Sequence, residues 1–222
     1  MKRWWVEIVL SAIVLIGASV QIFVLNSDSS KFSSTSSSVS TVLSEIRTLF
    51  CFDPAVPALE SSTVAMGCPE GTQSLGADPV PSHPEEAATL DSILAIRFAA
   101  AKAIANSEGI SLQLTSGFRS KTVQARLFAD EVKKLGSEQE AIKWVLPPDI
   151  SHHHQGTAID VNYNFDRPST KWLEINGYKF GLCRAYANEW WHFEALTSPG
   201  KKCPPMKINA SVDVAQYESS TP

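Results

Sequence analysis

Residues 151–160 have the sequence Ser-His-His-His-Gln-Gly-Thr-Ala-Ile-Asp, in which three imidazoles precede a carboxylate. From Thr157 to Tyr163 the side chains alternate, with Ala158 and Asp160 on one face, and this period is typical of a β-strand. The stretch therefore predicts a polar, histidine-rich loop that leads directly into a strand carrying Asp160.

A second short stretch, Glu189-Trp-Trp-His192, begins just before a strand expected over 191–195. Zinc favours imidazole nitrogens and carboxylate oxygens, and a catalytic zinc keeps three protein ligands and one open position. His153, Asp160 and His192 would make such a site. Glu189 would then be the general base, because a partly closed cleft raises the proton affinity of a glutamate.

Each of these pieces also has a simpler interpretation. A histidine triplet alone is more often a polar loop than a metal site, and spacing alone does not decide between His152, His153 and His154 as the ligand. Asp160 alone fits a helix cap or a buried ion pair. Residues 189–192 alone fit a strand end with packed aromatic side chains.

The remaining periodicity predicts an α+β fold, a small antiparallel sheet with helices packed on it, and the two stretches above would form a zinc cleft in it. Apolar residues three and four apart predict a helix over 90–106, in which only Arg97 breaks the apolar face. Strands and helices do not alternate as βαβ units, which argues against a parallel sheet. We also expect helices over 121–135 and 138–145, a strand over 111–116, an irregular proline-rich wrap over 52–88 and a loose tail over 206–222.

Composition narrows the class of protein. The chain has 222 residues, a formal net charge of −4, 44% hydrophobic residues and 19% charged residues. This length suits one ordinary domain with additions, and we expect the domain over residues 45–205. The mild acidity argues against a nucleic-acid partner, which usually meets a basic patch, and weakly against anionic lipid as a ligand.

The N-terminal residues 1–26 predict a membrane segment. Lys2 and Arg3 precede an uncharged run from Ile8 to Leu25, whose eighteen residues would span about 27 Å as a helix. The basic residues place the N-terminus inside and the rest of the chain outside. A cleaved signal peptide is the alternative, although the run is long for one. Serine-rich residues 27–44 predict a flexible linker behind it.

Export would permit disulfides. The chain has four cysteines, and we favour the pairs Cys51–Cys68 and Cys183–Cys203 because each closes a short local loop. Four cysteines leave other pairings open. Their spacing is unlike that of a cysteine-ligated zinc site.

The two stretches and a third one upstream together resemble a known family pattern. Ser151, His153, Gly156, Ala158 and Asp160 match S-x-H-x-x-G-x-A-x-D. Glu189, Trp191 and His192 match the downstream E-x-W-H, and Ser116-Gly-Phe-Arg-Ser120 with Gln124 matches an upstream S-G-x-R-S segment. In order and spacing, residues 90–196 resemble the LAS family of zinc peptidases, and most of all its VanY-type D-alanyl-D-alanine carboxypeptidases.

The resemblance implies roles for residues of this chain. It places the metal ligand of the histidine triplet at His153, beside Asp160 and His192, and implies one zinc ion per chain with Glu189 as base. It implies that Arg119 binds the substrate carbonyl or terminal carboxylate and stabilises the transition state. The substrate contacts it suggests are Gln124, Ser151 and Trp190.

The resemblance also implies the substrate and the location. The substrates of this family are peptidoglycan stem peptides that typically end in D-Ala-D-Ala. We therefore expect a bacterial cell-envelope enzyme, anchored by one membrane helix or secreted after signal cleavage. Glu189-Trp190-Trp191 departs from the Glu-Pro-Trp of many VanY-type enzymes and resembles the D,D-dipeptidase branch. The alternatives are therefore a D,D-dipeptidase, an L-Ala-D-Glu endopeptidase, a non-catalytic peptidoglycan-binding module or a plain structural protein.

Overall fold

The computed structural model describes residues 47–81, 87–162 and 166–220. The membrane segment expected over 1–26 and the linker expected over 27–44 lie outside these residues. Within the described ranges, no helix combines the length and the apolar character needed to cross a bilayer.

A four-stranded antiparallel sheet forms the centre of the molecule. Its strands run in the order β4 (Leu114–Ser116), β5 (Ala158–Val161), β7 (His192–Glu194) and β6 (Cys183–Arg184). The register pairs Asp160 with Ser116 on one side and with His192 on the other. Strand pairing therefore brings together residues from all three sequence motifs. The strands are shorter than the alternating stretches suggested, and the expected α+β class is confirmed.

The helices pack around this sheet. Helix α2 supplies much of the main core, in which its Leu94, Phe98 and Ala101 belong to the same buried cluster as Ile159 of β5 and Phe193 of β7. The helices are α2 (Ser92–Ser107), α3 (Lys121–Leu135), α4 (Glu138–Ala141), α5 (Arg167–Asn176) and α6 (Ser211–Ser220), with a 3-10 helix over Gly177–Phe180.

Local capping explains where several of these helices begin and end. Asp91 accepts hydrogen bonds from the backbone N–H groups of the first turn of α2, and Ser120 does the same for α3. Helix α3 has the bounds that the sequence predicts, because Gly136 ends it in the left-handed conformation. Helix α4 is shorter than expected, since the chain passes into turns after Ala141.

A second sheet corrects part of the irregular wrap expected over 52–88. Strands β1 (Thr48–Asp53), β2 (Ala58–Thr63) and β3 (Gln73–Ser74) form an antiparallel sheet in the order β2-β1-β3. Two of the prolines that suggested irregular structure, Pro54 and Pro57, lie in the turn between β1 and β2 rather than within these strands. The expected disulfide Cys51–Cys68 is confirmed here.

Arg97, the residue that breaks the apolar face of α2, is fully buried and connects α2 to two loops, one over residues 75–78 and one at Thr197. Its guanidinium donates to the backbone carbonyl oxygens of Leu75, Asp78 and Thr197. Burial lowers the pKa of Arg97 to about 10, which still leaves it charged at neutral pH. The chain makes room for it at Gly181, where an added Cβ would lie 2.6 Å from Arg97 Nη1.

The C-terminal residues are also ordered onto the body, so the loose tail expected over 206–222 is wrong for the described part. Tyr186 and Lys207 form a parallel β-bridge, Ala210 is buried, and α6 follows. The second expected disulfide, Cys183–Cys203, is confirmed and connects β6 to the start of this segment. Buried apolar contacts, rather than helical periodicity, explain why the segment docks.

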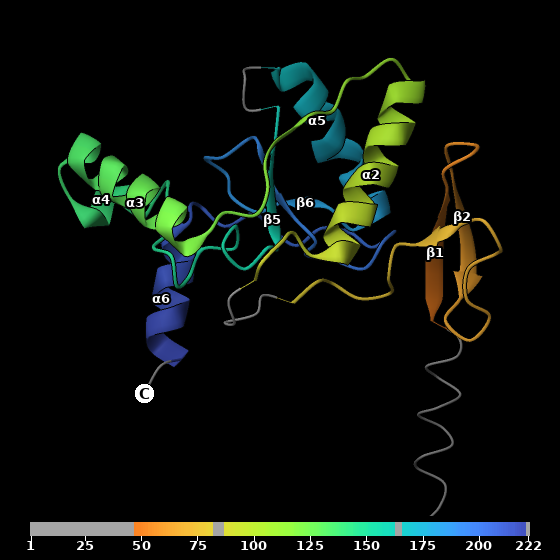
Figure 1. Cartoon of the computed structure of the whole chain (residues 1–222), viewed down its shortest axis with the longest axis horizontal. Helices are drawn as coiled ribbons and strands as arrows, with labels where there is room; N and C mark the ends of the chain where they lie inside the picture. The colour runs from red at the N-terminus through yellow and green to blue at the C-terminus, as the bar shows by residue number, and fades with distance from the viewer. Residues whose placement is uncertain (1–46, 82–86, 163–165, 221–222) are drawn as a thin grey trace, which may run out of the picture.

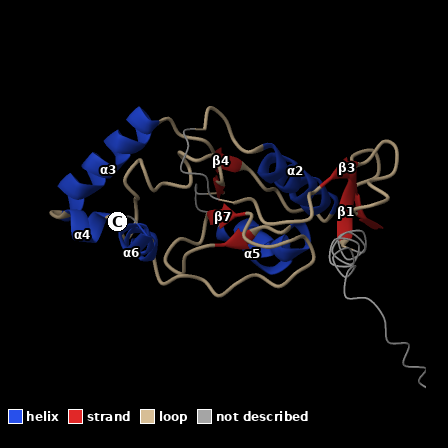
Figure 2. Ribbon diagram, turned by 90° about the horizontal axis from the view of Figure 1, so that it is seen from below, coloured by secondary structure: helices blue, strands red, loops and turns tan. Residues whose placement is uncertain are grey.

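Figures 1 and 2 give the overall arrangement. The β1–β2 hairpin lies at one end of the molecule and helices α3, α4 and α6 lie at the other, with the four-stranded sheet between them.

Candidate active site

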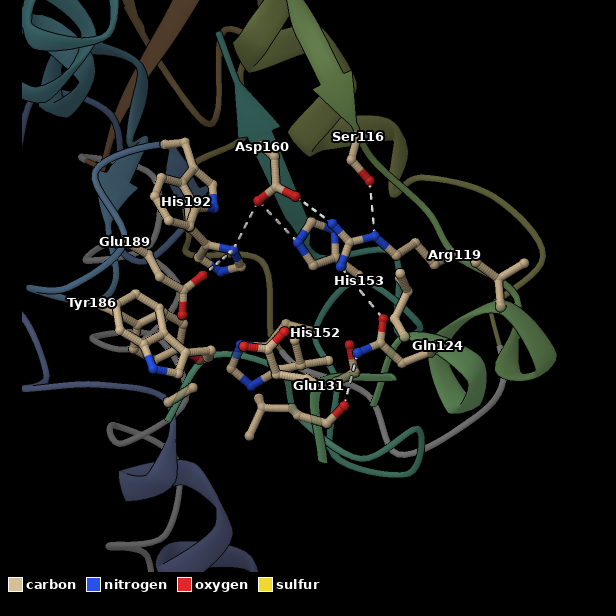
Figure 3. A pocket seen from close by; sticks show the side chains of 18 of the residues that line it. Ser116, Arg119, Gln124, Glu131, His152, His153, Asp160, Tyr186, Glu189 and His192 are labelled. Atoms are coloured by element: carbon tan, nitrogen blue, oxygen red, sulfur yellow. Dashed lines mark hydrogen bonds and ion pairs between the residues drawn. The ribbon is translucent and has the colours of Figure 1, made fainter. Parts of the chain in front are cut away.

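His153, Asp160 and His192 form a buried cluster that could hold a metal ion. His153 comes from the loop before β5, Asp160 from β5 and His192 from β7. His153 Nε2 lies 3.2 Å from Asp160 Oδ1, and His192 Nδ1 lies 3.3 Å from the same oxygen. Figure 3 shows the three side chains pointing toward one another.

The spacing of these atoms fits a tetrahedral zinc ion. Two ligands at about 2.0–2.1 Å from such an ion lie roughly 3.3 Å apart, which agrees with both measured distances. The donor set of two imidazole nitrogens and one carboxylate oxygen is one that zinc accepts.

Hydrogen bonds on the far side of each imidazole fix which nitrogen faces the cluster. His153 Nδ1 lies 2.8 Å from the carbonyl oxygen of Gly117, which can only accept, so Nδ1 carries the hydrogen and Nε2 is left to bind. His192 Nε2 lies 2.8 Å from Glu194 Oε1, so it donates and Nδ1 faces the cluster. Such partners orient metal-binding histidines and raise their basicity.

The residues of the cluster shift one another's pKa values. Burial alone would raise the pKa of Asp160, but His153 and His192 hold it well below its usual range. Burial alone would lower the pKa of His192, but hydrogen bonds to Asp160 and Glu194 raise it to about 10. The two carboxylates that flank His192 therefore favour its positively charged form.

Glu189 lies beside this cluster. Its side chain is buried, and its Oε2 lies 3.9 Å from His192 Nδ1. Burial, reinforced by the charges of Asp160 and Glu194, raises the pKa of Glu189 to about 7. A carboxyl group that titrates near neutral pH can take up a proton and release it again at low cost.

Arg119 borders the cluster on the opposite side. Its Nε donates to Ser116 Oγ at 2.9 Å, its Nη1 donates to Gln124 Oε1 at 3.4 Å, and its Nη2 forms an ion pair with Asp160 Oδ2. Gln124 is itself fixed, because its Nε2 donates to the carbonyl oxygen of Leu146 at 2.8 Å. The guanidinium is thus held rigidly between α3 and β5, as Figure 3 shows.

These side chains line one cleft with a cavity volume of about 560 Å³. Ser151 lines it with the cluster, Glu189, Arg119 and Gln124, while Val123, Leu127 and Trp144 supply apolar surface farther out. The cleft is large enough for several residues of a peptide. It therefore contains every residue that the sequence suggested for the site, with one exception.

The exception is Trp190, which the sequence suggested as a substrate contact. Among the described residues, Trp190 lines a different cavity, where the Arg167 guanidinium lies 5.3 Å from the centre of its ring. Trp191 lines the cleft instead. The two indoles pack edge to face at 88°, and each lines a different cavity.

Glu194 and His152 also belong to the site, and the motifs did not single them out as a pair. Glu194 Oε1 accepts hydrogen bonds from both His152 Nδ1 and His192 Nε2, each at 2.8 Å. Glu194 lies two residues after His192 on β7, and the two-residue period of a strand puts both on one face. That period was the signal that could have identified Glu194.

Gly156 is required by the path of the loop before β5. Its φ is +73°, and an added Cβ would lie 2.4 Å from the carbonyl oxygen of Thr89. The Gly156 carbonyl in turn accepts from the backbone N–H of Asp91 at 2.9 Å. The loop that carries His153 is therefore fastened to the start of α2 by a close backbone approach that only glycine permits.

Comparison with known proteins confirms the family resemblance drawn from the motifs. Residues 87–195 match the model of the VanY family, described as D-alanyl-D-alanine carboxypeptidase. A D-alanyl-D-alanine carboxypeptidase of Enterococcus faecalis (strain ATCC 700802 / V583) is 27% identical, over 40% of this chain and 41% of its own. YodJ of Bacillus subtilis (strain 168) is 34% identical, over 37% of this chain and 33% of its own. The match thus spans less than half the length of either relative.

Two solved structures are similar in part. One is a mutant of the vancomycin resistance D,D-pentapeptidase VanY in complex with Zn(II), with a TM-score of 0.45 and 20% identity, over 63% of this chain and 88% of that one. The other is VanYB in complex with D-alanine-D-alanine, with the same TM-score and identity, over 64% of this chain and 87% of that one.

Proposed function

We propose that this chain, whose residues 87–195 match the model of the VanY family, is a zinc-dependent D,D-carboxypeptidase that removes the terminal D-Ala from peptidoglycan stem peptides. The observation that carries the proposal is the cluster of His153, Asp160 and His192 in one cleft with Glu189 and Arg119. The cluster would hold one zinc ion, and Glu189 and Arg119 would act on the peptide.

A zinc ion bound there would polarise the scissile carbonyl and favour deprotonation of a water molecule. Glu189 accepts that proton as the water attacks the carbonyl carbon, and then delivers it to the nitrogen of the departing D-Ala as the C–N bond breaks. The raised pKa of Glu189, about 7, suits both steps, since it makes the two protonation states nearly equal in free energy near neutral pH.

Arg119 binds the negative charge of the substrate. A guanidinium has five N–H donors, and three of them are engaged by Ser116, Gln124 and Asp160. Its two remaining donors can bind the terminal carboxylate or the developing oxyanion in the planar geometry that arginine provides. Ser151 and Gln124 line the same wall, and we assign them substrate hydrogen bonds.

The position of Trp190 bears on the alternatives. The Glu-Trp-Trp-His sequence resembled the dipeptidase branch, but Trp190 lines a cavity separate from the cleft. The residue at this variable position therefore does not line the cleft, so the sequence difference does not by itself favour a dipeptidase. A dipeptidase, an L-Ala-D-Glu endopeptidase and a non-catalytic peptidoglycan-binding module are distinguished by the products formed.

We place the enzyme in the bacterial cell envelope, outside the cytoplasm, because its proposed substrate is there. Two disulfides within the described residues suit an oxidising compartment. Residues 1–26 would anchor the chain in the membrane and residues 27–44 would tether the catalytic domain, with secretion after signal cleavage as the alternative.

The test is mass spectrometry of defined muropeptides after incubation with the full-length protein. Pentapeptides ending in D-Ala-D-Ala should lose one D-Ala, and tetrapeptides should stay intact. Glu189→Gln should abolish the release, whereas Glu218→Gln, the same change at an exposed position on α6, should not. Chelation should stop the reaction and added zinc should restore it. Activity that survives Glu189→Gln, or cleavage at another bond, would refute the proposal.

A further inference from the structure

The C-terminal segment, residues 204–220, lies outside the family match at 87–195 but contributes to the wall of the cleft. Lys207 enters by a parallel bridge to Tyr186. Its N–H donates to the carbonyl oxygen of Ala185 at 2.9 Å, and its own carbonyl accepts from the N–H of Ala187 at 2.8 Å. Ala210, which is buried, lines the cleft directly. The segment is thus joined to the residues that immediately precede Glu189.

A buried carboxylate connects this segment to Tyr186. Asp213 on α6 is 6% exposed, and its Oδ2 accepts a hydrogen bond from the Tyr186 hydroxyl at 2.6 Å. Its Oδ1 forms an ion pair with Lys207 Nζ. Both oxygens of Asp213 are therefore engaged, and the Tyr186 hydroxyl is held by a charge-assisted hydrogen bond, the stronger kind.

Tyr186 in turn lies against a residue of the metal cluster. The centres of the Tyr186 and His192 rings are 5.0 Å apart, and their planes are inclined by 39°. His192 also meets the edge of the His153 ring at 5.0 Å and is bonded to Asp160 and Glu194 through its two nitrogens. Hydrogen bonds restrict the direction of the His192 nitrogens, and the Tyr186 ring restricts the tilt of the imidazole plane.

We propose that Asp213 is a positioning residue of the metal centre: through the Tyr186 hydroxyl, it holds the tyrosine ring against His192 and keeps Nδ1 of that histidine directed at the metal. The C-terminal segment is then part of the active site rather than an appendage to it. This inference rests on the metal site of the proposed function.

The test measures zinc affinity by competition with a chromophoric chelator, together with the melting temperature of the metal-free protein. Asp213→Ala and Tyr186→Phe should each weaken zinc binding by about tenfold, the lower end of the range for residues that orient ligands. Asp213→Asn keeps an acceptor for the tyrosine and should restore most of the affinity. Glu218→Gln removes a carboxylate from the exposed face of the same helix and should leave the affinity unchanged.

A double variant separates positioning from general stability. If Asp213 acts through Tyr186, Tyr186→Phe combined with Asp213→Ala should bind zinc no more weakly than the weaker single variant. Independent, additive losses would overturn the proposal. So would lower melting temperatures with unchanged zinc affinity, which would give Asp213 a merely structural role.

Zinc binding requires no substrate, so the two proposals can fail separately. A wild-type protein that binds zinc but releases no D-Ala would refute the proposed function alone. A wild-type protein that releases D-Ala, with Asp213 and Tyr186 variants that bind zinc normally, would refute this inference alone.

Discussion

Replacing Glu194 with glutamine tests how much of the metal site depends on a residue that does not touch the metal. Glu194 is 2% exposed, and a single oxygen of it accepts hydrogen bonds from His152 and His192, both at 2.8 Å. Burial alone would raise the pKa of Glu194, but the two histidines hold it well below its usual range. Glu194→Gln preserves the shape and one acceptor oxygen but removes the charge.

The expected magnitude follows from these two bonds. A hydrogen bond to a charged group contributes about 1 kcal/mol more than a neutral one, so two such bonds predict a loss of about 2 kcal/mol in stability. For a domain of this size, that loss lowers the melting temperature by roughly 4–8 °C. One of the two bonds orients His192, so zinc affinity should fall by about 5- to 10-fold.

The assays are thermal melting of the metal-free protein and competition for zinc with a chelator. Glu60→Gln, on the exposed edge strand β2, makes the same chemical change away from the cleft and serves as the matched control. If Glu194→Gln and the control bind zinc with the same affinity, the reasoning that the Glu194 carboxylate orients His192 is wrong.

Two further predictions concern stability. Replacing Cys183 and Cys203 together with serine opens a loop closed at a separation of 20 residues, and urea unfolding should show a loss of about 3 kcal/mol; an unchanged midpoint would contradict this. In the metal-free protein, the pKa of His192 is about 10, above its unfolded value of about 6.5. The contribution of His192 to the free energy of unfolding is therefore complete below pH 6.5 and is lost as the pH rises through 10. Urea unfolding of the metal-free protein between pH 6.5 and 10 should show a free energy of unfolding that falls with pH, and the fall should be smaller in His192→Gln. The same fall in both proteins would contradict this prediction.

The centre of the site could be predicted from the sequence because its residues lie in short motifs on neighbouring strands. Asp160 and His192 sit directly opposite each other in the β5–β7 register, and His153 lies on the loop that enters β5. Alternation predicted the strands, and the spacing of apolar residues predicted α2. The alternation did not predict the strand order, because that order depends on pairing between strands that are distant in the sequence.

The parts that the sequence did not predict depend on contacts between distant residues. The hydroxyl of Tyr186 meets Asp213 across 27 positions, and His152 meets Glu194 across 42. The bonding partner of a buried carboxylate has no local signature, because it is chosen by packing. The docking of α6 was missed for the same reason, since the buried residues Ala210 and Asp213 form no amphipathic stripe by themselves.

The buried guanidinium of Arg97 has a consequence for the order of folding. Its three carbonyl partners lie 19, 22 and 100 positions away along the chain. The last of these contacts closes a loop that spans much of the catalytic domain, and such long-range closures form slowly. Before then, water must solvate the charge, so α2 cannot settle fully against the sheet. Strands β5 and β7 of that sheet carry Asp160 and His192 of the cleft. Full satisfaction of the buried Arg97 guanidinium therefore requires a chain that extends at least to Thr197.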